Sequence, residues 1–336
     1  MLPSRFSVLD RSPVRANSTP GAALRDTVAF AREIEALGYH RFWVSEHHSV
    51  PGIAGAAPLV LASAVAAATS TIRVGTGGVM LPNHPPLVVA EQFGVLESLF
   101  PGRIDMGLGR SVGFTDGIRR ALGHGKDDAD RFGEQVSELL GYFDGTQTRH
   151  PGVHAVAAEG ARVPAFLLAT GAGADLAAEL GLPLVIAAIR GEKAMTDAID
   201  RYRDNFRQSS FGPAYVIVST AVSVAENSSR ARDLLLPEAW STTYSRTRGE
   251  FPPLLAPDQV RALTITDRER ARLDQALAGQ IHGTESEVLE RLEGLAERTA
   301  ADEFLITTAS HDRVALLDSY RGLAGLVTRQ VATVAG

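Results

Sequence analysis

The chain has 336 residues, of which 45% are hydrophobic and 21% charged, with a net charge of −6 and no cysteine. This composition is typical of a globular protein and excludes disorder or coiled coil as the main state. The lack of cysteine excludes disulfides, thiolate nucleophiles, iron–sulfur clusters and cysteine-ligated zinc. The negative charge argues against nucleic acid as a partner. Because the sequence has neither a membrane-length apolar run nor a signal-peptide core, we expect no membrane contact and a cytoplasmic location.

Short β-branched segments alternate with longer segments of helical periodicity. Candidate strands cover residues 6–10, 41–45, 72–81, 103–108, 163–169, 183–189, 215–224 and 303–308. Candidate helices cover residues 24–37, 58–69, 86–100, 132–143, 174–180, 192–206, 285–300 and 311–323. This alternation indicates parallel strands, and eight units favour an α/β fold of the closed (β/α)8 (TIM) barrel type over an open doubly wound sheet.

One segment interrupts the alternation. Residues 236–283 contain four prolines, a polar stretch at 241–248 and a charged helical pattern around 267–277. We interpret the chain as one domain over residues 1–336, with 236–283 inserted between the seventh strand and its main helix. Long insertions on barrels often cover the active site, so this one is a candidate lid, with an inert excursion or a dimer contact as the alternatives.

In a barrel the active site lies at the carboxyl ends of the strands. Polar residues and glycines gather after several of the candidate strands. They are Glu46-His47-His48 after the second, Gly77-Gly78 and His84 in and after the third, Gly107–Ser111 in the fourth, Thr170–Gly173 after the fifth, and Thr307, Thr308 and His311 after the eighth.

The histidine pair suggests acid–base chemistry, but adjacent residues on a strand point to opposite faces. We therefore expect at most one of His47 and His48 to enter the pocket. A metal site would need three or four convergent ligands, and although Glu46, His47 and His84 can be nominated, nothing in their spacing brings them together. We predict no metal.

Two glycine-rich turns are candidate anion sites. Gly109, Arg110 and Ser111 can direct backbone amides and a guanidinium at an anion, unless Arg110 pairs with an acidic residue such as Asp116. The turn of Ala169, Thr170, Gly171, Ala172 and Gly173 leads into a helix with free N–H groups, unless Thr170 merely caps that helix. Two such turns on neighbouring strands predict a ligand that carries phosphate, either a phosphorylated substrate or a flavin.

Several ordered motifs resemble the bacterial luciferase-like flavin monooxygenase family. They are Phe42–His48 (FWVSEHH), Ile72–His84 (IRVGTGGVMLPNH), Ala90–Phe93 (AEQF), Phe100–Ser111 (FPGRIDMGLGRS), Leu167–Gly171 (LLATG), Gly181–Pro183 (GLP) and Asp302–Thr308 (DEFLITT). The resemblance runs from Phe6 to about Leu326 and implies a TIM barrel that is usually a homodimer, with the dimer contact near the helices at 58–69 and 86–100.

The resemblance also implies chemistry. Reduced FMN, supplied by a separate NAD(P)H flavin reductase, would react with O2 to give a C4a-peroxyflavin that hydroxylates or epoxidises a small organic substrate. By their place in these motifs, His47 matches the catalytic histidine of the family, and Glu46 matches the acidic residue beside it. Gly77-Gly78 matches a cis peptide beneath the flavin ring, and Arg110 matches the arginine that holds the flavin phosphate. The turn of residues 169–173 completes the phosphate site.

The chain departs from the luciferases proper at three positions. Gly109 stands where they have a reactive cysteine, the phosphate turn carries Gly171, Ala172 and Gly173 in place of acidic and hydroxyl side chains, and Ala188 replaces an aromatic residue. We therefore expect no light emission.

Other functions stay open at this point. The main alternative is deazaflavin-dependent hydride transfer, which a basic groove around Arg119 and Arg120 would favour. A flavin-storage barrel and a metal hydrolase are further alternatives. Candidate residues for the substrate pocket are Val112, Phe114, Ile189 and residues of the 236–283 insertion.

Overall fold

The computed structural model describes residues 2–335 and shows a closed parallel barrel, as the strand–helix alternation predicts. Within these residues eight strands form the wall, one of them in two pieces, and β3 pairs with β5 to close it. The barrel strands are β1 (Phe6–Asp10), β2 (Arg41–Val44), β3 (Arg73–Thr76) with β4 (Val79–Met80), β5 (Ile104–Gly109), β6 (Ala165–Ala169), β7 (Leu184–Ala187), β8 (Val216–Thr220) and β11 (Glu303–Ile306).

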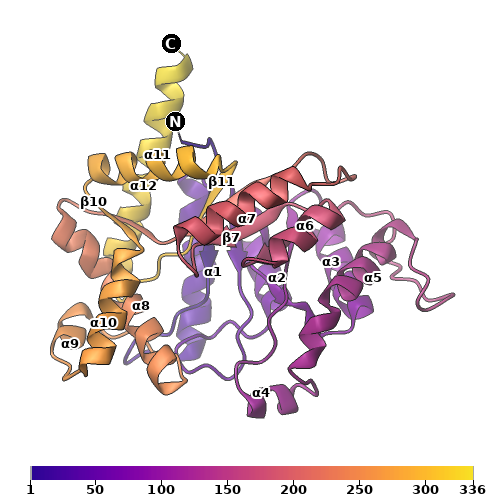
Figure 1. Cartoon of the computed structure of the whole chain (residues 1–336), viewed down its shortest axis with the longest axis horizontal. Coiled ribbons are helices and arrows are strands. Elements are labelled where there is room, and N and C mark those ends of the chain that lie inside the picture. Colours follow the sequence, from indigo (N-terminus) through magenta and orange to yellow (C-terminus); the bar gives the residue numbers. More distant parts are fainter. Residues whose placement is uncertain (1, 336) are drawn as a thin grey trace.

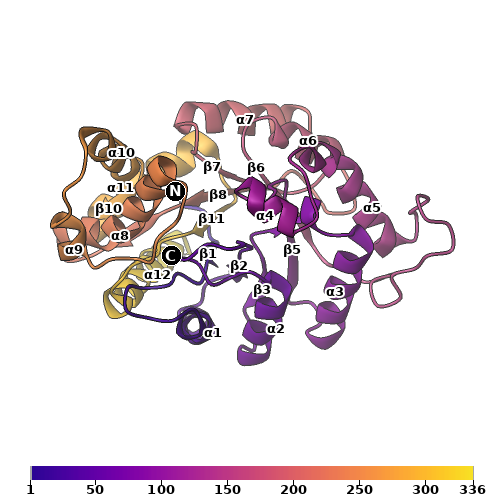
Figure 2. The ribbon, with the colours of Figure 1, turned by 90° about the horizontal axis from the view of Figure 1, so that it is seen from below.

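Helices surround the barrel, and most of them return the chain from one strand to the next (Figures 1 and 2). They are α1 (Pro20–Ala36), α2 (Pro58–Ala68), α3 (Pro86–Leu99), α5 (Phe132–Asp144), α6 (Gly173–Leu180), α7 (Glu192–Asp204), α11 (Glu285–Thr299) and α12 (Arg313–Ala335). Proline occupies the first position of α1, α2 and α3. The N–H of that position has no partner within a helix, so proline, which lacks an N–H, costs no hydrogen bond there. Among the described residues, no helix is long and apolar enough to cross a membrane.

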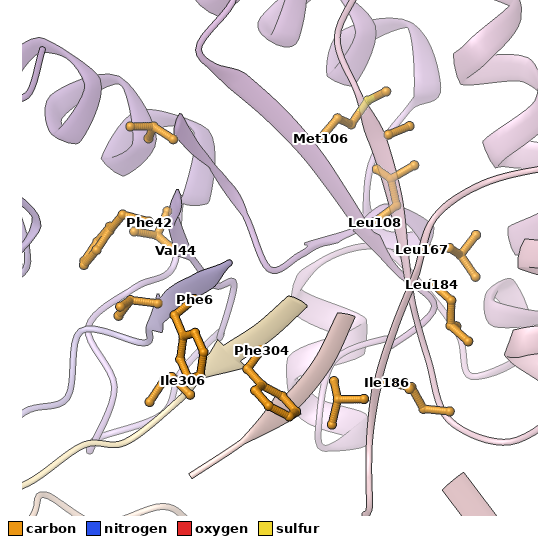
Figure 3. Packing of buried hydrophobic residues seen from close by; sticks show 14 of the residues in the cluster. Phe6, Phe42, Val44, Met106, Leu108, Leu167, Leu184, Ile186, Phe304 and Ile306 are labelled. Atoms are coloured by element: carbon orange, nitrogen blue, oxygen red, sulfur yellow. The ribbon is translucent and has the colours of Figure 1, made fainter. Parts of the chain in front are cut away.

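Alternation along the strands divides the apolar core into two parts. Residues such as Phe42 and Phe304 point outward and pack beneath the helices (Figure 3). Their neighbours Trp43 and Leu305 point inward and fill the barrel with Phe166 and other apolar side chains. The interior is therefore a packed core, and a ligand can enter only at an end of the barrel.

A buried ion-pair network closes the amino-terminal end of the barrel. Arg41 donates to Asp105 at 2.8 Å and to both carboxylate oxygens of Glu303 at 2.8 and 3.0 Å. Arg73 also donates to Asp105, and the Tyr215 hydroxyl donates to Glu303 at 2.8 Å. Because buried charges need partners, this network is a structural plug, and it leaves the opposite, carboxyl end for the site.

The structure differs from the expected elements in two strands. The third strand is broken into β3 and β4 at Gly77-Gly78, whose peptide bond is cis. The seventh ends at Thr220, and the next residues form β9 (Val222–Val224), which leaves the barrel to pair with β10 (Ile281–Gly283).

The helices differ as well. The polar stretch at 241–248 is helical, because it continues α8 (Ser228–Arg248) beyond Pro237. Among the described residues, four short helices also lie outside the expected helices, namely the 3-10 helices η1 (Leu81–Asn83) and η2 (Asp127–Arg131), α4 (Asp116–Ala121) and α9 (Pro257–Arg261). The charged pattern around 267–277 forms α10 (Asp267–Ala278). Figure 2 shows α8, α9 and α10 grouped on one side of the barrel and α4 in front of the strands.

Candidate active site

A cavity of about 1130 Å³ opens at the carboxyl ends of the strands. Its volume is at the upper end of the range for ligand pockets, which leaves room for a cofactor together with a substrate. The lining includes most of the site residues expected from the sequence, namely Glu46, His47, Gly77, Gly78, Gly109, Arg110, Ser111, Ala169, Thr170, Ala172 and Gly173. Gly171 is not part of this lining. It shapes the turn behind it with a φ of +62°.

His47 lies just beyond β2, with its Nδ1 3.1 Å from the Ser45 hydroxyl. Its backbone N–H donates to the Gly55 carbonyl at 2.8 Å, which holds this part of the loop in place. Burial, followed by the positive charge of Arg11, lowers the pKa of His47 to about 4. The imidazole is therefore neutral at neutral pH, and its two nitrogens can accept or donate a single proton.

Glu46 is fully buried and connects three neighbours. One carboxylate oxygen lies 2.6 Å from His48 Nε2 and 2.8 Å from His84 Nε2, and the other accepts the Met80 N–H at 2.8 Å. Burial by itself raises the pKa of Glu46, but these hydrogen bonds outweigh it and lower the pKa to about 2. Glu46 is therefore a permanent carboxylate that joins the end of β2 to β4.

The expectation that at most one histidine of the pair enters the pocket is wrong, because both His47 and His48 line the cavity. Strand alternation does not apply here, since β2 already ends at Val44. Glu46, His48 and His84 also form a cluster whose ligand atoms lie within 4.8 Å of one another, close enough for a metal ion. His47 is not a member of that cluster, and the hydrogen bonds already give each of the three side chains a partner.

Glycines keep the cavity floor free of side chains. A Cβ atom at Gly77 would lie 2.7 Å from a Leu9 methyl group, and one at Gly78 would lie 2.8 Å from the Gly107 carbonyl oxygen. Both separations are too short for a side chain to fit without movement. The two glycines thus present bare backbone to the cavity, a surface on which a flat ring can lie.

Arg110 lies on the loop that follows β5, the strand next to β4. It donates to Asp130 at 2.7 Å and to the Ala129 carbonyl at 2.9 Å, and its side chain is 58% exposed. The acidic partner is thus Asp130 rather than Asp116, which pairs with Arg119 instead. An exposed ion pair of this kind is weak, so a phosphate group can compete for the guanidinium.

The start of α6 supplies the second anion site. Its N-cap residue is Ala172 rather than Thr170, and within the described chain no side chain caps the helix. Ala174 and Asp175 donate to the Gly171 and Ala172 carbonyls, which leaves the N–H groups of Ala172 and Gly173 open to a ligand. Arg190, which was not among the residues expected from the sequence, follows β7 and lines the cavity. Its Nη1 lies 3.7 Å from where a Cβ of Gly171 would be. Applying the strand-end rule to the sixth candidate strand would have found it.

The expected substrate residues Val112, Phe114 and Ile189 all line the cavity. From the 236–283 insertion, Phe251 joins them, and its ring centroid lies 6.0 Å from that of Phe114. The sequence alone does not single out Phe251, because it lies between elements with no periodic pattern.

The model of the family described as luciferase-like monooxygenase matches residues 4–303. The chain is 37% identical to a luciferase-like monooxygenase of Escherichia coli (strain K12), over 94% of both chains. It is 32% identical to the N-acetyl-S-alkylcysteine monooxygenase of Bacillus subtilis (strain 168), over 96% of this chain and 98% of that protein.

Solved structures agree with these matches. The structure of apo-MsnO8 has a TM-score of 0.85 at 30% identity and covers 96% of this chain and 98% of its own. Several structures below 20% identity also share the fold, and two of them illustrate it. They are the oxygenating constituent of 3,6-diketocamphane monooxygenase from Pseudomonas putida in complex with FMN, with a TM-score of 0.68, and an F420-dependent secondary alcohol dehydrogenase, with a TM-score of 0.69. Both cover 96% or more of each chain. The chain belongs to the luciferase-like monooxygenase family.

Proposed function

We propose that the protein is an FMN-dependent monooxygenase that hydroxylates or epoxidises a small organic substrate. The observation that carries this proposal is the single cavity that joins His47, the bare backbone of Gly77-Gly78 and Arg110. A proton-exchanging side chain, a floor for a flat ring and a cation for a phosphate are the groups that such a reaction needs from the protein.

The residues present fit FMN. Arg110, the Thr170 hydroxyl and the open N–H groups of Ala172 and Gly173 would hold the phosphate, and Gly77-Gly78 would face the ring. When bound, reduced FMN would supply two electrons, so that one atom of O2 enters the substrate and the other leaves as water. A separate NAD(P)H flavin reductase would supply the reduced FMN, as the resemblance implies.

His47 would hold or move a proton on the substrate side of the cavity. Ser45 engages Nδ1, which leaves Nε2 as the nitrogen for this exchange. Because the imidazole is neutral at neutral pH, it can accept a hydrogen bond from a hydroxyl group that forms during the reaction. Glu46 would act through its neighbours, since its carboxylate is engaged by His48, His84 and the Met80 N–H.

Deazaflavin-dependent hydride transfer is the competing function. It would need a basic surface for an acidic tail, and Arg119 and Arg120 are the nearest candidates in the sequence. Arg119, however, is largely buried, pairs with Asp116 and donates to the Gly113 carbonyl at 2.6 Å. Because Arg119 is already engaged, it is not available to bind the acidic tail of a deazaflavin coenzyme. This favours FMN as the cofactor.

The test is anaerobic titration of the protein with reduced FMN and with reduced F420, the deazaflavin coenzyme. We expect tighter binding of FMN, and a preference for F420 would overturn the proposal. Arg110→Ala should weaken FMN binding by about five- to 150-fold, the cost of a lost charge-assisted hydrogen bond. It should leave riboflavin, which has no phosphate, unaffected. Arg149→Ala, at an exposed arginine that pairs with Glu134 and Glu138, is the matched control.

We also propose that the protein is a homodimer through α2 and α3. Val60 of α2 is 72% exposed and Leu99 of α3 is 62% exposed, and Val88 and Val95 add to the apolar surface of α3. A second copy packing on these helices would remove this surface from water. The resemblance to the family implies a contact at these two helices and so supports the proposal.

The insertion at 236–283 is proposed to cover the cavity. Phe251 is the residue of this insertion that lines the cavity. Nearby, Glu238 of α8 forms an ion pair with Arg11, after β1, and accepts the Ala309 N–H, after β11, at 2.9 Å. These contacts attach the insertion to the rim of the barrel, where it would limit the access of water to the site.

A further inference from the structure

The cavity is divided by charge. Arg110, Asp130 and Arg190 lie at the end with the start of α6, where the phosphate of the proposed cofactor would bind. The other ionisable lining residues are Glu46, His47 and His48. Glu46 is paired with His48, and His47 is neutral at neutral pH. The substrate end therefore offers no unpaired charge among the described lining residues.

Two phenylalanines from distant segments meet in the lining of this cavity. Phe114 follows β5 and Phe251 follows α8, and their rings are inclined by 55°. Phe114 is 54% exposed, which is unusual for a large apolar side chain. Val50, Val112 and Ile189 are further apolar residues of the cavity lining.

The backbone holds Phe251 firmly. Its carbonyl accepts the Gly52 N–H at 2.8 Å, and three residues further on the Leu254 N–H donates to the Val14 carbonyl at 2.8 Å. A side chain at Gly52 would overlap the Pro252 carbonyl, so the two segments pack in direct backbone contact. The backbone of Phe251 is thus held in place beside the cavity that its side chain lines.

The Phe114 side chain, by contrast, contacts the Phe251 ring from the loop between β5 and α4. The fixed ring of Phe251 therefore sets the position of the pair.

We propose that Phe251 and Phe114 select an uncharged, apolar substrate with a flat ring or unsaturated face. This inference rests on the proposed function and specifies the substrate class for the same site. A charged substrate would lose its hydration at this end without gaining a counter-ion. A flat apolar substrate instead gains contact with the faces and edges of two rings, which aromatic pairs favour beyond simple burial.

The experiment titrates the full chain with 2-naphthol and 2-naphthoate by calorimetry, with and without saturating FMN. The two probes share a ring system and differ in charge. We expect naphthol to bind and naphthoate to bind about tenfold more weakly or worse. Phe251→Leu and Phe114→Leu, which keep apolar volume but remove the ring, should each weaken naphthol binding by about two- to tenfold.

Controls separate this inference from the proposed function. Phe211→Leu, at a partly buried phenylalanine outside the cavity lining, should leave naphthol binding unchanged. FMN affinity of the variants should stay within about twofold of the parent protein, since neither phenylalanine belongs to the proposed phosphate site. Equal binding of the two probes, no naphthol binding, or full binding by Phe251→Leu would each overturn the inference. Failure of FMN to bind while naphthol still depends on Phe251 would overturn the cofactor assignment alone.

Discussion

Replacing Glu46 by glutamine should destabilise the protein and change its response to acid. The carboxylate is fully buried and accepts hydrogen bonds from His48, His84 and the Met80 N–H. Glutamine has nearly the same shape, but its amide NH2 must face at least one of these donors. The variant therefore loses a charge, and a histidine that faces the NH2 must change tautomer to accept from it.

The pKa of Glu46 sets the magnitude. Burial opposes the charge, but the hydrogen bonds outweigh it and lower the pKa from 4.5 to about 2. A carboxylate whose pKa is lower in the folded state stabilises the fold above its unfolded pKa, and that stability is lost as the pH falls through the folded pKa. The full contribution is about 3 kcal/mol, of which about 2 kcal/mol should disappear between pH 5 and pH 3.

Urea unfolding of the parent protein and of Glu46→Gln at about pH 5 and pH 3 provides the assay. His47, whose pKa is about 4, titrates between these two pH values in both proteins, so its contribution cancels in the stability gap. We expect a stability gap of about 3 kcal/mol at pH 5 that shrinks to about 1 kcal/mol at pH 3. The control Glu290→Gln, at an exposed position of α11, should change stability by less than about 0.5 kcal/mol. A gap that is absent at pH 5, or equal at both pH values, would refute this reasoning.

Three further outcomes are expected. Gly107→Ala should destabilise the protein by about 1–3 kcal/mol in urea unfolding, because its Cβ would overlap the Thr76 carbonyl oxygen, whereas Gly109→Ala should be tolerated because its Cβ would meet only Val79 O, at 3.7 Å. Val60→Asp should convert the proposed dimer to a monomer in light scattering, and an unchanged mass would place the contact elsewhere. The pKa of His47, lowered to about 4 by burial and then by Arg11, means that stability is lost as the pH falls from about 6.5 to 4. His47→Gln should make this part of the stability profile flatter, and an identical slope would contradict the assignment.

Much of the fold follows from local sequence patterns. The eight strand–helix units are visible because residues such as Phe42 and Trp43 alternate between the two faces of a strand, a pattern with a period of two. Parallel strands place their carboxyl ends together, so the position of His47, Gly77 and Arg110 at one cavity can be predicted from the order of the elements. These features depend on neighbours in the chain, which a sequence displays directly.

The tertiary structure decided which distant side chains meet. Asp130 pairs with Arg110, His84 reaches Glu46, and Phe251 packs against Phe114, and none of these contacts can be predicted from spacing. Each depends on the path of a loop or insertion whose residues have no periodic pattern. Periodicity reports how a segment orients its own side chains, whereas contact across the barrel depends on how loops of different length return to the same rim. The sequence by itself therefore determined the barrel and the end that carries the site, and the tertiary structure decided the lining of that site.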